Sequence, residues 1–238
     1  MKRTLFDALQ EARAAKRPVA VVTDLDSGAQ SLVDEQSVKG DLALEGGQLA
    51  ASRRAIADDK SGLLDGTRLF VHVFNPPLRL IVVGAVHIAQ SLVPMAELAG
   101  YAVTLVDPRQ AWASPERFPD VTLLTDWPDE ALTALEPDRR TAVVTLTHDP
   151  KLDNPALAVA LKSDVFYIGS LGSRKTHGKR LAALRDMGFG EADFARIHGP
   201  IGLAIGAKSP AEIALAILAQ ITQVKHGAPP LIRQEAAE

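Results

Sequence analysis

From Leu78 onward, short apolar runs alternate with segments of helical periodicity, and this alternation is what most constrains the fold. The run 78–84 (LRLIVVG) is apolar almost throughout, as in strands buried on both faces of a sheet. Strands that alternate with helices predict an α/β protein with a doubly wound parallel sheet, here spanning 78–226. Further strands are expected at 101–107, 121–125, 141–147 and 165–169, and helices at 87–99, 128–135, 155–162, 174–187 and 209–226.

The first 75 residues have a different pattern, and we expect them to form a small α+β domain. Asn75-Pro76-Pro77 marks its end, because consecutive prolines interrupt regular structure. A hairpin is predicted from strands at 18–25 and 29–33, joined by the turn Asp26-Ser27-Gly28. The polar segment 34–47 is expected to form loops. The other expected elements are helices at 4–15 and 48–59, a strand at 67–74, and a flexible tail at 227–238.

Composition excludes several classes of function. The net charge of −3 gives no general attraction to nucleic acid, and no apolar run approaches the length of about 18 residues that a membrane span needs. The chain has no cysteine, so it offers no thiolate for catalysis or metal binding. The charged N-terminal segment does not resemble a signal peptide, and the histidines lack metal-binding spacing. We therefore expect a cytoplasmic protein with no nucleic-acid partner, no membrane span and no metal site built from protein ligands alone.

The first strand of the predicted sheet ends in a partial dinucleotide-binding fingerprint, Gly-x-Gly-x-x-Gly/Ala. Gly84 and Ala89 occupy its first and last positions, and Asp107 stands where a ribose-binding carboxylate belongs. Val86 occupies the middle position, where a β-branched side chain obstructs a pyrophosphate. The pattern predicts a Rossmann-like fold. It leaves open whether the protein binds NAD(P) or has a fold of this type that does not use a dinucleotide.

A candidate anion site follows the strand at 165–169, in the sequence VFYIGSLGSRKT. Small residues leave backbone N–H groups accessible, and a helix N-terminus and two cations add positive charge. A phosphate could bind there; the alternative is a glycine-rich turn with two solvated cations. His177, next along the predicted helix, is expected to be solvated. The candidate residues are Gly169, Gly172, Ser173, Arg174, Lys175 and Thr176.

His148 and Asp149 follow the strand at 141–147. Because the carboxyl ends of parallel strands line one crevice, these two residues are expected on the same edge as the Gly84 turn and the Gly169 loop. His148 is a candidate base or ligand contact, or else a structural cap of the next loop. Asp153 is expected to cap a helix that begins near Pro155.

Four more residues have two interpretations each. Arg109 is placed to reach an anion in the crevice or to pair with Asp107. Arg117 either contacts a ligand or holds a loop, and His87 either contacts a ligand or faces solvent at a helix start. His198 either contacts a ligand or satisfies a buried carbonyl.

Together these segments resemble the XdhC/CoxI family of xanthine dehydrogenase accessory proteins, closely over Leu78–Gln220 and loosely before it. Each motif alone is weak, but their order along one chain is specific. The chain departs from the family at Val86, where members usually have glycine, and at Gly46-Gly47-Gln48, where many have Gly-Gly-Cys. The motifs are GAVH (84–87), DPR (107–109), ERFP (116–119), THD (147–149), YIG (167–169), GSRKT (172–176) and HGPIGLAIGA (198–207).

The resemblance implies a maturation factor, non-catalytic rather than an enzyme. Such a protein binds the molybdenum cofactor, a molybdopterin with or without an added nucleotide. It protects the cofactor, supports its sulfuration by a cysteine desulfurase, and delivers it to an apo molybdenum hydroxylase of the xanthine dehydrogenase or CO dehydrogenase type. The resemblance also implies a homodimer or a pairing with a paralogue. The alternative function is an NAD(P)-dependent oxidoreductase. The implied cofactor-binding residues are Gly84, His87, Asp107, Arg109, His148, Asp149, Gly169, Gly172, Ser173, Arg174, Lys175, Thr176 and His198.

Overall fold

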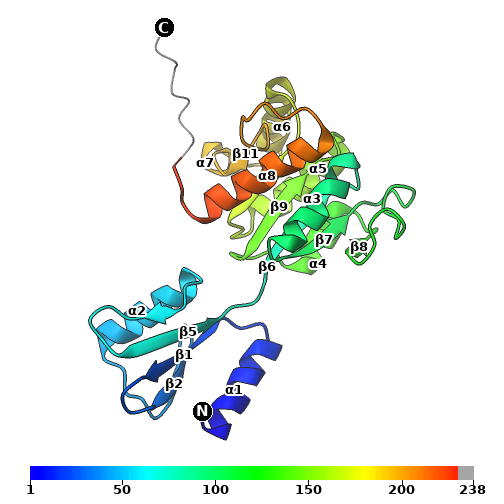
Figure 1. Cartoon of the computed structure of the whole chain (residues 1–238). Coiled ribbons are helices and arrows are strands. Elements are labelled where there is room, and N and C mark those ends of the chain that lie inside the picture. The colour runs from blue at the N-terminus through cyan, green and yellow to red at the C-terminus, as the bar shows by residue number, and fades with distance from the viewer. Residues whose placement is uncertain (230–238) are drawn as a thin grey trace. The chain divides into compact units, whose positions relative to one another are not determined.

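A computed structural model describes residues 1–229 of the chain, as two compact units (Figure 1). The first unit spans Met1–Pro76 and the second begins at Pro77, so the division falls between the two prolines. Most of the expected tail, 227–238, lies outside the described residues.

The first unit is an antiparallel five-stranded sheet of order β3-β2-β1-β5-β4, with one helix on each face. The central strand β1 is buried on both faces, because Val19 and Val21 pack under α1 while Ala20 and Val22 pack under α2. The elements of this unit are α1 (Arg3–Ala14), β1 (Val19–Asp24), β2 (Gln30–Val33), β3 (Val38–Gly40), α2 (Gly46–Ala57), β4 (Gly62–Leu63) and β5 (Leu69–Phe74).

The predicted hairpin is confirmed, since β1 and β2 pair antiparallel with Ala20 opposite Val33. The expectation of loops over 34–47 is wrong in part, because β3 pairs with β2. All three residues of β3 are exposed, so the strand carries no apolar alternation that sequence reasoning could detect. The two-residue strand β4 was not expected either.

The second unit contains a six-stranded parallel sheet of order β11-β10-β9-β6-β7-β8, which is the Rossmann arrangement that the sequence predicts. Chain order proceeds outward from β6 through β7 to β8, then returns and continues from β9 on the other side. The elements are β6 (Leu78–Val83), α3 (His87–Leu98), β7 (Tyr101–Val106), β8 (Thr122–Leu124), α4 (Pro128–Leu135), β9 (Thr141–Thr145), α5 (Pro150–Leu161), β10 (Tyr167–Ser170), α6 (Arg174–Asp186), α7 (Glu191–Phe194), β11 (Ile197–His198) and α8 (Pro210–Lys225).

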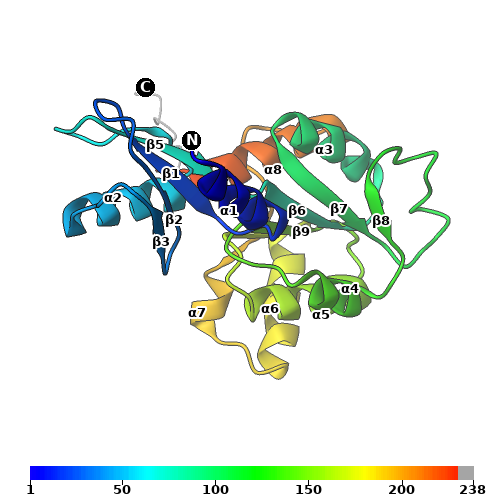
Figure 2. The ribbon, with the colours of Figure 1, turned by 90° about the horizontal axis from the view of Figure 1, so that it is seen from below.

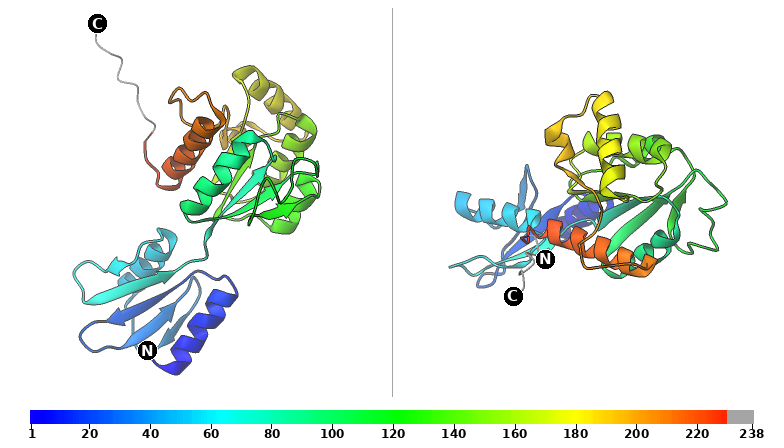
Figure 3. Two further views of the ribbon diagram at one scale, coloured as in Figure 1. Left: turned by 45° about the vertical axis from the view of Figure 1, so that its right-hand side comes forward. Right: turned by 90° about the horizontal axis from the view of Figure 1, so that it is seen from above.

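Helices cover both faces of the parallel sheet (Figures 2 and 3). Leu80 and Val82 of β6 pack in the core that includes α3 and α8, whereas Ile81 and Val83 pack in the core that includes α4, α5 and α6. Burial on both faces explains why these strands are apolar runs rather than alternating ones.

Helix α5 begins five residues earlier than predicted, at Pro150 instead of Pro155. Asp149 caps it by accepting a hydrogen bond from the Lys151 N–H at 2.9 Å, and Pro150 fits its first position. Asp153, expected to be the cap, therefore lies in the first turn of the helix. Strand β11 and helix α7 were not predicted, because two and four residues are too short to show a period.

Candidate functional site

The order in which the chain adds strands to the sheet reverses between β6 and β9. The turns that follow these two strands are in contact. Gly84 has φ +115°, and a side chain built there would lie 2.8 Å from the Cγ2 of Thr147. Only glycine fits this position, as the fingerprint requires. In open sheets of this type the ligand crevice lies at this reversal, at the carboxyl ends of the strands.

Asp107, after β7, is fully buried and makes four hydrogen bonds. Its Oδ2 accepts from the Ala85 N–H at 2.8 Å, and its Oδ1 accepts from the Arg109 N–H at 3.0 Å. The Arg109 guanidinium donates to both oxygens, from Nε to Oδ1 at 2.8 Å and from Nη2 to Oδ2 at 2.8 Å. Of the two sequence interpretations of Arg109, the structure shows the pairing with Asp107.

Burial and hydrogen bonding act in opposite directions on the pKa of Asp107. Burial by itself would raise the pKa of the Asp107 carboxyl, but the hydrogen bonds from Arg109 and Ala85 outweigh burial and hold this pKa below its usual value. The side-chain hydrogen bonds to Asp107 also raise the pKa of Arg109. The carboxylate is thus ionised, and its partner is a permanent cation.

Trp112 lies in the loop after β7, next to this pair. The Arg109 guanidinium carbon is 5.0 Å from the Trp112 ring centroid, and that of Arg117 is 5.7 Å from it. Arg117 also donates from Nη1 to the backbone oxygens of Ala85, at 2.9 Å, and Trp112, at 2.5 Å. Arg117 therefore holds the loop against the Gly84-Ala85 turn, one of the two roles expected of it.

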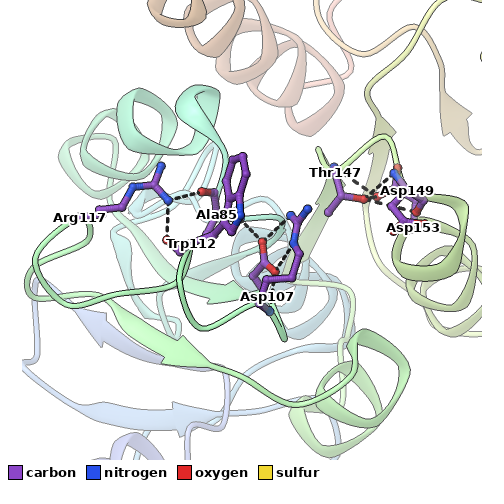
Figure 4. A network of polar contacts seen from close by, with 8 residues as sticks. Ala85, Asp107, Trp112, Arg117, Thr147, Asp149 and Asp153 are labelled. Atoms are coloured by element: carbon purple, nitrogen blue, oxygen red, sulfur yellow. Dashed lines mark hydrogen bonds and ion pairs between the residues drawn. The ribbon is translucent and has the colours of Figure 1, made fainter.

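On the other side of the reversal in strand order, Thr147 connects the end of β9 to the start of α5. Figure 4 shows Asp107 and Trp112 on one side, and Thr147, Asp149 and Asp153 on the other. The Thr147 hydroxyl donates to Asp153 Oδ1 at 2.6 Å and accepts from the Asp149 N–H at 3.0 Å. Between Thr147 and Asp149, His148 is exposed and has φ +62°, a conformation that non-glycine residues rarely adopt.

Asp153 forms a buried ion pair with Arg180 of α6, at 3.5 Å between Oδ2 and Nη2. The side chains are 1% and 4% exposed respectively. Arg180 Nη2 also donates to the Leu171 carbonyl at 2.9 Å, so this arginine supports the loop that precedes α6. Its Nη1 is buried without a partner among the residues that the structure describes.

The candidate anion site is the N-terminus of α6. Ser173 caps the helix by accepting from the Thr176 N–H at 3.2 Å, and the two hydroxyls of these residues are 3.0 Å apart. The first two amides of the helix, those of Arg174 and Lys175, have no partner within residues 1–229, and both side chains are exposed. Gly172, at φ +146°, leaves room for Thr176, since a side chain there would meet it at 3.1 Å.

One expectation about this segment is confirmed and one needs correction. Gly169 lies in a strand, as predicted, and β10 continues one residue further to Ser170, whose hydroxyl is 2.5 Å from that of Thr145. A side chain at Gly169 would meet Ile201 at 2.5 Å, so the glycine is required by packing. His177 is not solvated; it is half-buried, and a side chain at Gly199 would meet its Nδ1.

His87 and His198 have different surroundings. His87 begins α3 and is exposed, consistent with the solvent-facing alternative. The His198 ring stacks on that of Tyr167 at 4.8 Å between centroids, and burial lowers the pKa of His198. Among the hydrogen bonds of residues 1–229, none joins the His198 ring to a buried carbonyl, the structural alternative expected for it. Within the described range, no group of three or more His, Asp or Glu residues could hold a metal ion.

The first unit has a hollow of its own, of about 620 Å³, between α1 and the β2–β3 hairpin. Three charged side chains line it. Lys2 and Asp41 pair with each other at 2.6 Å and are both largely exposed, and Lys39 is exposed as well. The carboxyl edge of the parallel sheet, in contrast, carries the buried carboxylate of Asp107 after β7 and the exposed cations Arg174 and Lys175 at the start of α6, which is why we place the candidate site there.

Sequence reasoning missed two residues of this edge, Trp112 and Arg180. Trp112 is one of only two tryptophans in the chain and follows Arg109 closely, a signal that could have been used. Arg180 lies in a helix rich in cations, and nothing in the sequence separates it from its exposed neighbours.

Residues 80–221 match the family model described as the XdhC Rossmann domain. "Uncharacterized protein YqeB" of Escherichia coli is 32% identical over 74% of this chain and 32% of its own length. A Bacillus subtilis protein, named as a probable xanthine dehydrogenase subunit, is 32% identical over 67% of this chain and 46% of its own. "Molybdenum cofactor insertion chaperone PaoD" of E. coli is 30% identical over 64% of this chain and 42% of its own. The chain thus spans about a third to a half of these relatives.

A crystal structure described as that of a xanthine dehydrogenase, from Bacillus halodurans, has the same fold, with a TM-score of 0.71 and 24% identity. The superposition covers 99% of this chain and 65% of the other. No helix among residues 1–229 is long and apolar enough to cross a membrane.

Proposed function

The chain belongs to the XdhC family, whose Rossmann domain it contains, and on this basis we propose that it is a maturation factor for molybdenum hydroxylases of the xanthine dehydrogenase or CO dehydrogenase type. It binds the molybdenum cofactor as cargo, protects it, supports its sulfuration and delivers it to the apoenzyme. The names of two relatives, one a molybdenum cofactor insertion chaperone and one a probable xanthine dehydrogenase subunit, support this proposal.

The observation that carries the proposal is the chemistry of one sheet edge. The α6 N-terminus offers unpaired amides with exposed Arg174 and Lys175, and the same edge offers the buried acceptor Asp107. A flat pterin with a phosphate needs both, because its phosphate binds to amides and cations while its ring presents N–H donors. Gly172, Ser173 and Thr176 would complete the phosphate end, and Gly84, His87, Arg109, His148, Asp149 and His198 are the further candidates.

The absence of cysteine from the sequence bears on which partner would supply sulfur. It has no cysteine, and Gln48, where many family members have one, is used for structure: its Oε1 accepts the Glu45 N–H at the start of α2, at 3.0 Å. A persulfide must therefore come from another protein, for which a cysteine desulfurase is the chemical class. We further propose that the protein is cytoplasmic, non-catalytic, and a homodimer or paired with a paralogue.

The test is to purify the protein without oxygen from a host that makes the cofactor, oxidise it, and quantify the fluorescent pterin released. We expect the intact protein to carry pterin and the Arg174→Ala/Lys175→Ala variant to lose most of it. The matched control is Lys179→Ala/Lys225→Ala, which also removes two exposed cations but leaves the α6 N-terminus intact. Absence of pterin from the intact protein would end the proposal.

The second candidate function is an NAD(P)-dependent oxidoreductase, favoured by the strand order and by an aspartate at the end of β7. Val86 argues against it, because a β-branched side chain stands where the backbone would have to approach a pyrophosphate. Micromolar binding of NADH or NADPH with no pterin uptake would favour this candidate instead.

A further inference from the structure

The four hydrogen bonds of Asp107 differ in what they hold in place. Two come from backbone N–H groups, of Ala85 and Arg109, and fix the carboxylate at the end of β7. The other two come from the Arg109 side chain, which is 34% exposed. Since a carboxylate has about four acceptor positions, removing the guanidinium would free one on each oxygen while the backbone keeps the group oriented.

The Arg109 guanidinium is a flat group held in two ways at once. Its edge presents two parallel N–H donors to the two oxygens of Asp107, and its carbon lies 5.0 Å from the Trp112 ring centroid. A heterocycle with an amino group beside a ring N–H presents the same pair of donors, and a flat ring stacks on an indole as a guanidinium does. The 2-amino-4-oxopyrimidine ring of a pterin has this edge, at N3–H and the 2-amino group.

We infer that Asp107 recognises the 2-amino-4-oxopyrimidine edge of a pterin and that Trp112 supports its ring. Arg109, instead of contacting the cargo as one of the candidate residues, occupies this position until the ligand displaces it. This inference rests on the proposed function. It names the residues that bind the pterin end of the cargo, opposite the phosphate. Arg117 keeps the supporting surface in place, since it anchors the Trp112 loop to the Ala85 carbonyl.

Exchange of one flat group for the other is feasible on physical grounds. Arg109 is partly exposed and carries its charge into water when it leaves, so no cation is left buried. Asp107 stays in place on its two backbone N–H donors, and a ligand that supplies two further donors fills the acceptor positions that Arg109 leaves. A ligand with an oxygen in place of the 2-amino group would face the carboxylate with an acceptor and be rejected.

The experiment compares two pteridines that differ at this edge, pterin and lumazine, which has a 2-oxo group. Binding is measured by quenching of tryptophan fluorescence. We expect the intact protein to bind pterin at least about tenfold more tightly than lumazine, and Asp107→Asn to bring the ratio close to one. Equal affinity of the intact protein for both compounds would overturn the inference.

The Arg109→Ala variant tests the displacement step. Because Arg109 competes for Asp107, its removal should tighten pterin binding by about tenfold and leave the preference over lumazine in place. The control is Arg68→Ala, whose arginine also pairs with an aspartate, at 3.1 Å, but in the first unit. Weaker pterin binding by Arg109→Ala would show that Arg109 binds ligand directly and would refute the displacement. These arms do not depend on the folding of Asp107→Asn.

Failure of the inference is distinguishable from failure of the proposed function. If the purified protein carries pterin but does not discriminate pterin from lumazine, the edge recognition is wrong and the maturation role stands. If the purified protein discriminates pterin from lumazine but carries no pterin, the edge recognition stands and the maturation role is wrong. If Asp107→Asn abolishes NADH binding and leaves pterin binding unchanged, the carboxylate serves a ribose and the inference is overturned.

Discussion

The buried pair between Asp153 and Arg180 leads to an asymmetric prediction about stability. Both charges are out of water, and burial acts on each in the expected direction: it raises the pKa of Asp153 and lowers that of Arg180. The two groups differ in how they respond to losing the partner. A carboxylate can take up a proton and become neutral, whereas a guanidinium remains charged at any ordinary pH. Removing Asp153 should therefore cost more than removing Arg180.

The magnitude follows from the geometry. At the observed 3.5 Å, the attraction is worth about 5 kcal/mol at an effective dielectric constant near 20, against a desolvation penalty of several kcal/mol for each ion. In Asp153→Asn the amide oxygen can still accept from Thr147, so the loss is electrostatic, and we expect a decrease of about 3–5 kcal/mol in the free energy of unfolding. For Arg180→Met we expect about half of that, because Asp153 then becomes protonated.

Urea unfolding at pH 7 measures these differences, with tryptophan fluorescence as the probe. Both tryptophans, Trp112 and Trp127, lie in the second unit, so the signal reports on the unit that contains the pair. The double variant Asp153→Asn/Arg180→Met should be more stable than Asp153→Asn alone, since it no longer has a buried charge without a partner. The reasoning is refuted if Arg180→Met is destabilised as much as Asp153→Asn or more.

Three further predictions concern packing and pH. Gly84→Ala should lower the free energy of unfolding by about 1–3 kcal/mol, because φ is +115° at this position and the new side chain would collide with Thr147. The control Gly178→Ala, in open space within α6, should raise the free energy of unfolding by about 0.5–1 kcal/mol. Urea unfolding of both variants measures the two changes. Tyr167→Phe should cost about 1 kcal/mol in the same assay, since the buried hydroxyl loses its 2.6 Å hydrogen bond to a glutamine of α8. Burial lowers the pKa of both His198 and His177, so these two histidines bind protons more readily in the unfolded chain than in the folded one. Their contribution to the free energy of unfolding should be fully present above about pH 6.5 and be lost as the pH decreases below that value. A free energy of unfolding that does not change between pH 7 and pH 5 would contradict this.

The elements that the sequence predicted correctly are those with a long enough period. The strands at 78–84 and 141–147 are apolar because both of their faces are covered, and the order of strands and helices was enough to predict the parallel sheet. Short elements without a period, such as β3 and β11, were missed. The start of α5 was misplaced because two residues, Asp149 and Asp153, could both cap it, and the sequence does not tell which one does.

At the candidate site, local sequence determined the residue types that follow each strand, and chain direction in a parallel sheet brings those positions to one edge. Which side chains pair across that edge was decided only by the fold. Arg109 closes on Asp107 two residues away, but Arg180 reaches Asp153 across 27 positions, and Trp112 is held in place by Arg117. Backbone periodicity is a short-range property that a sequence displays directly. The partner of a buried charge depends instead on which distant segments the hydrophobic core brings together.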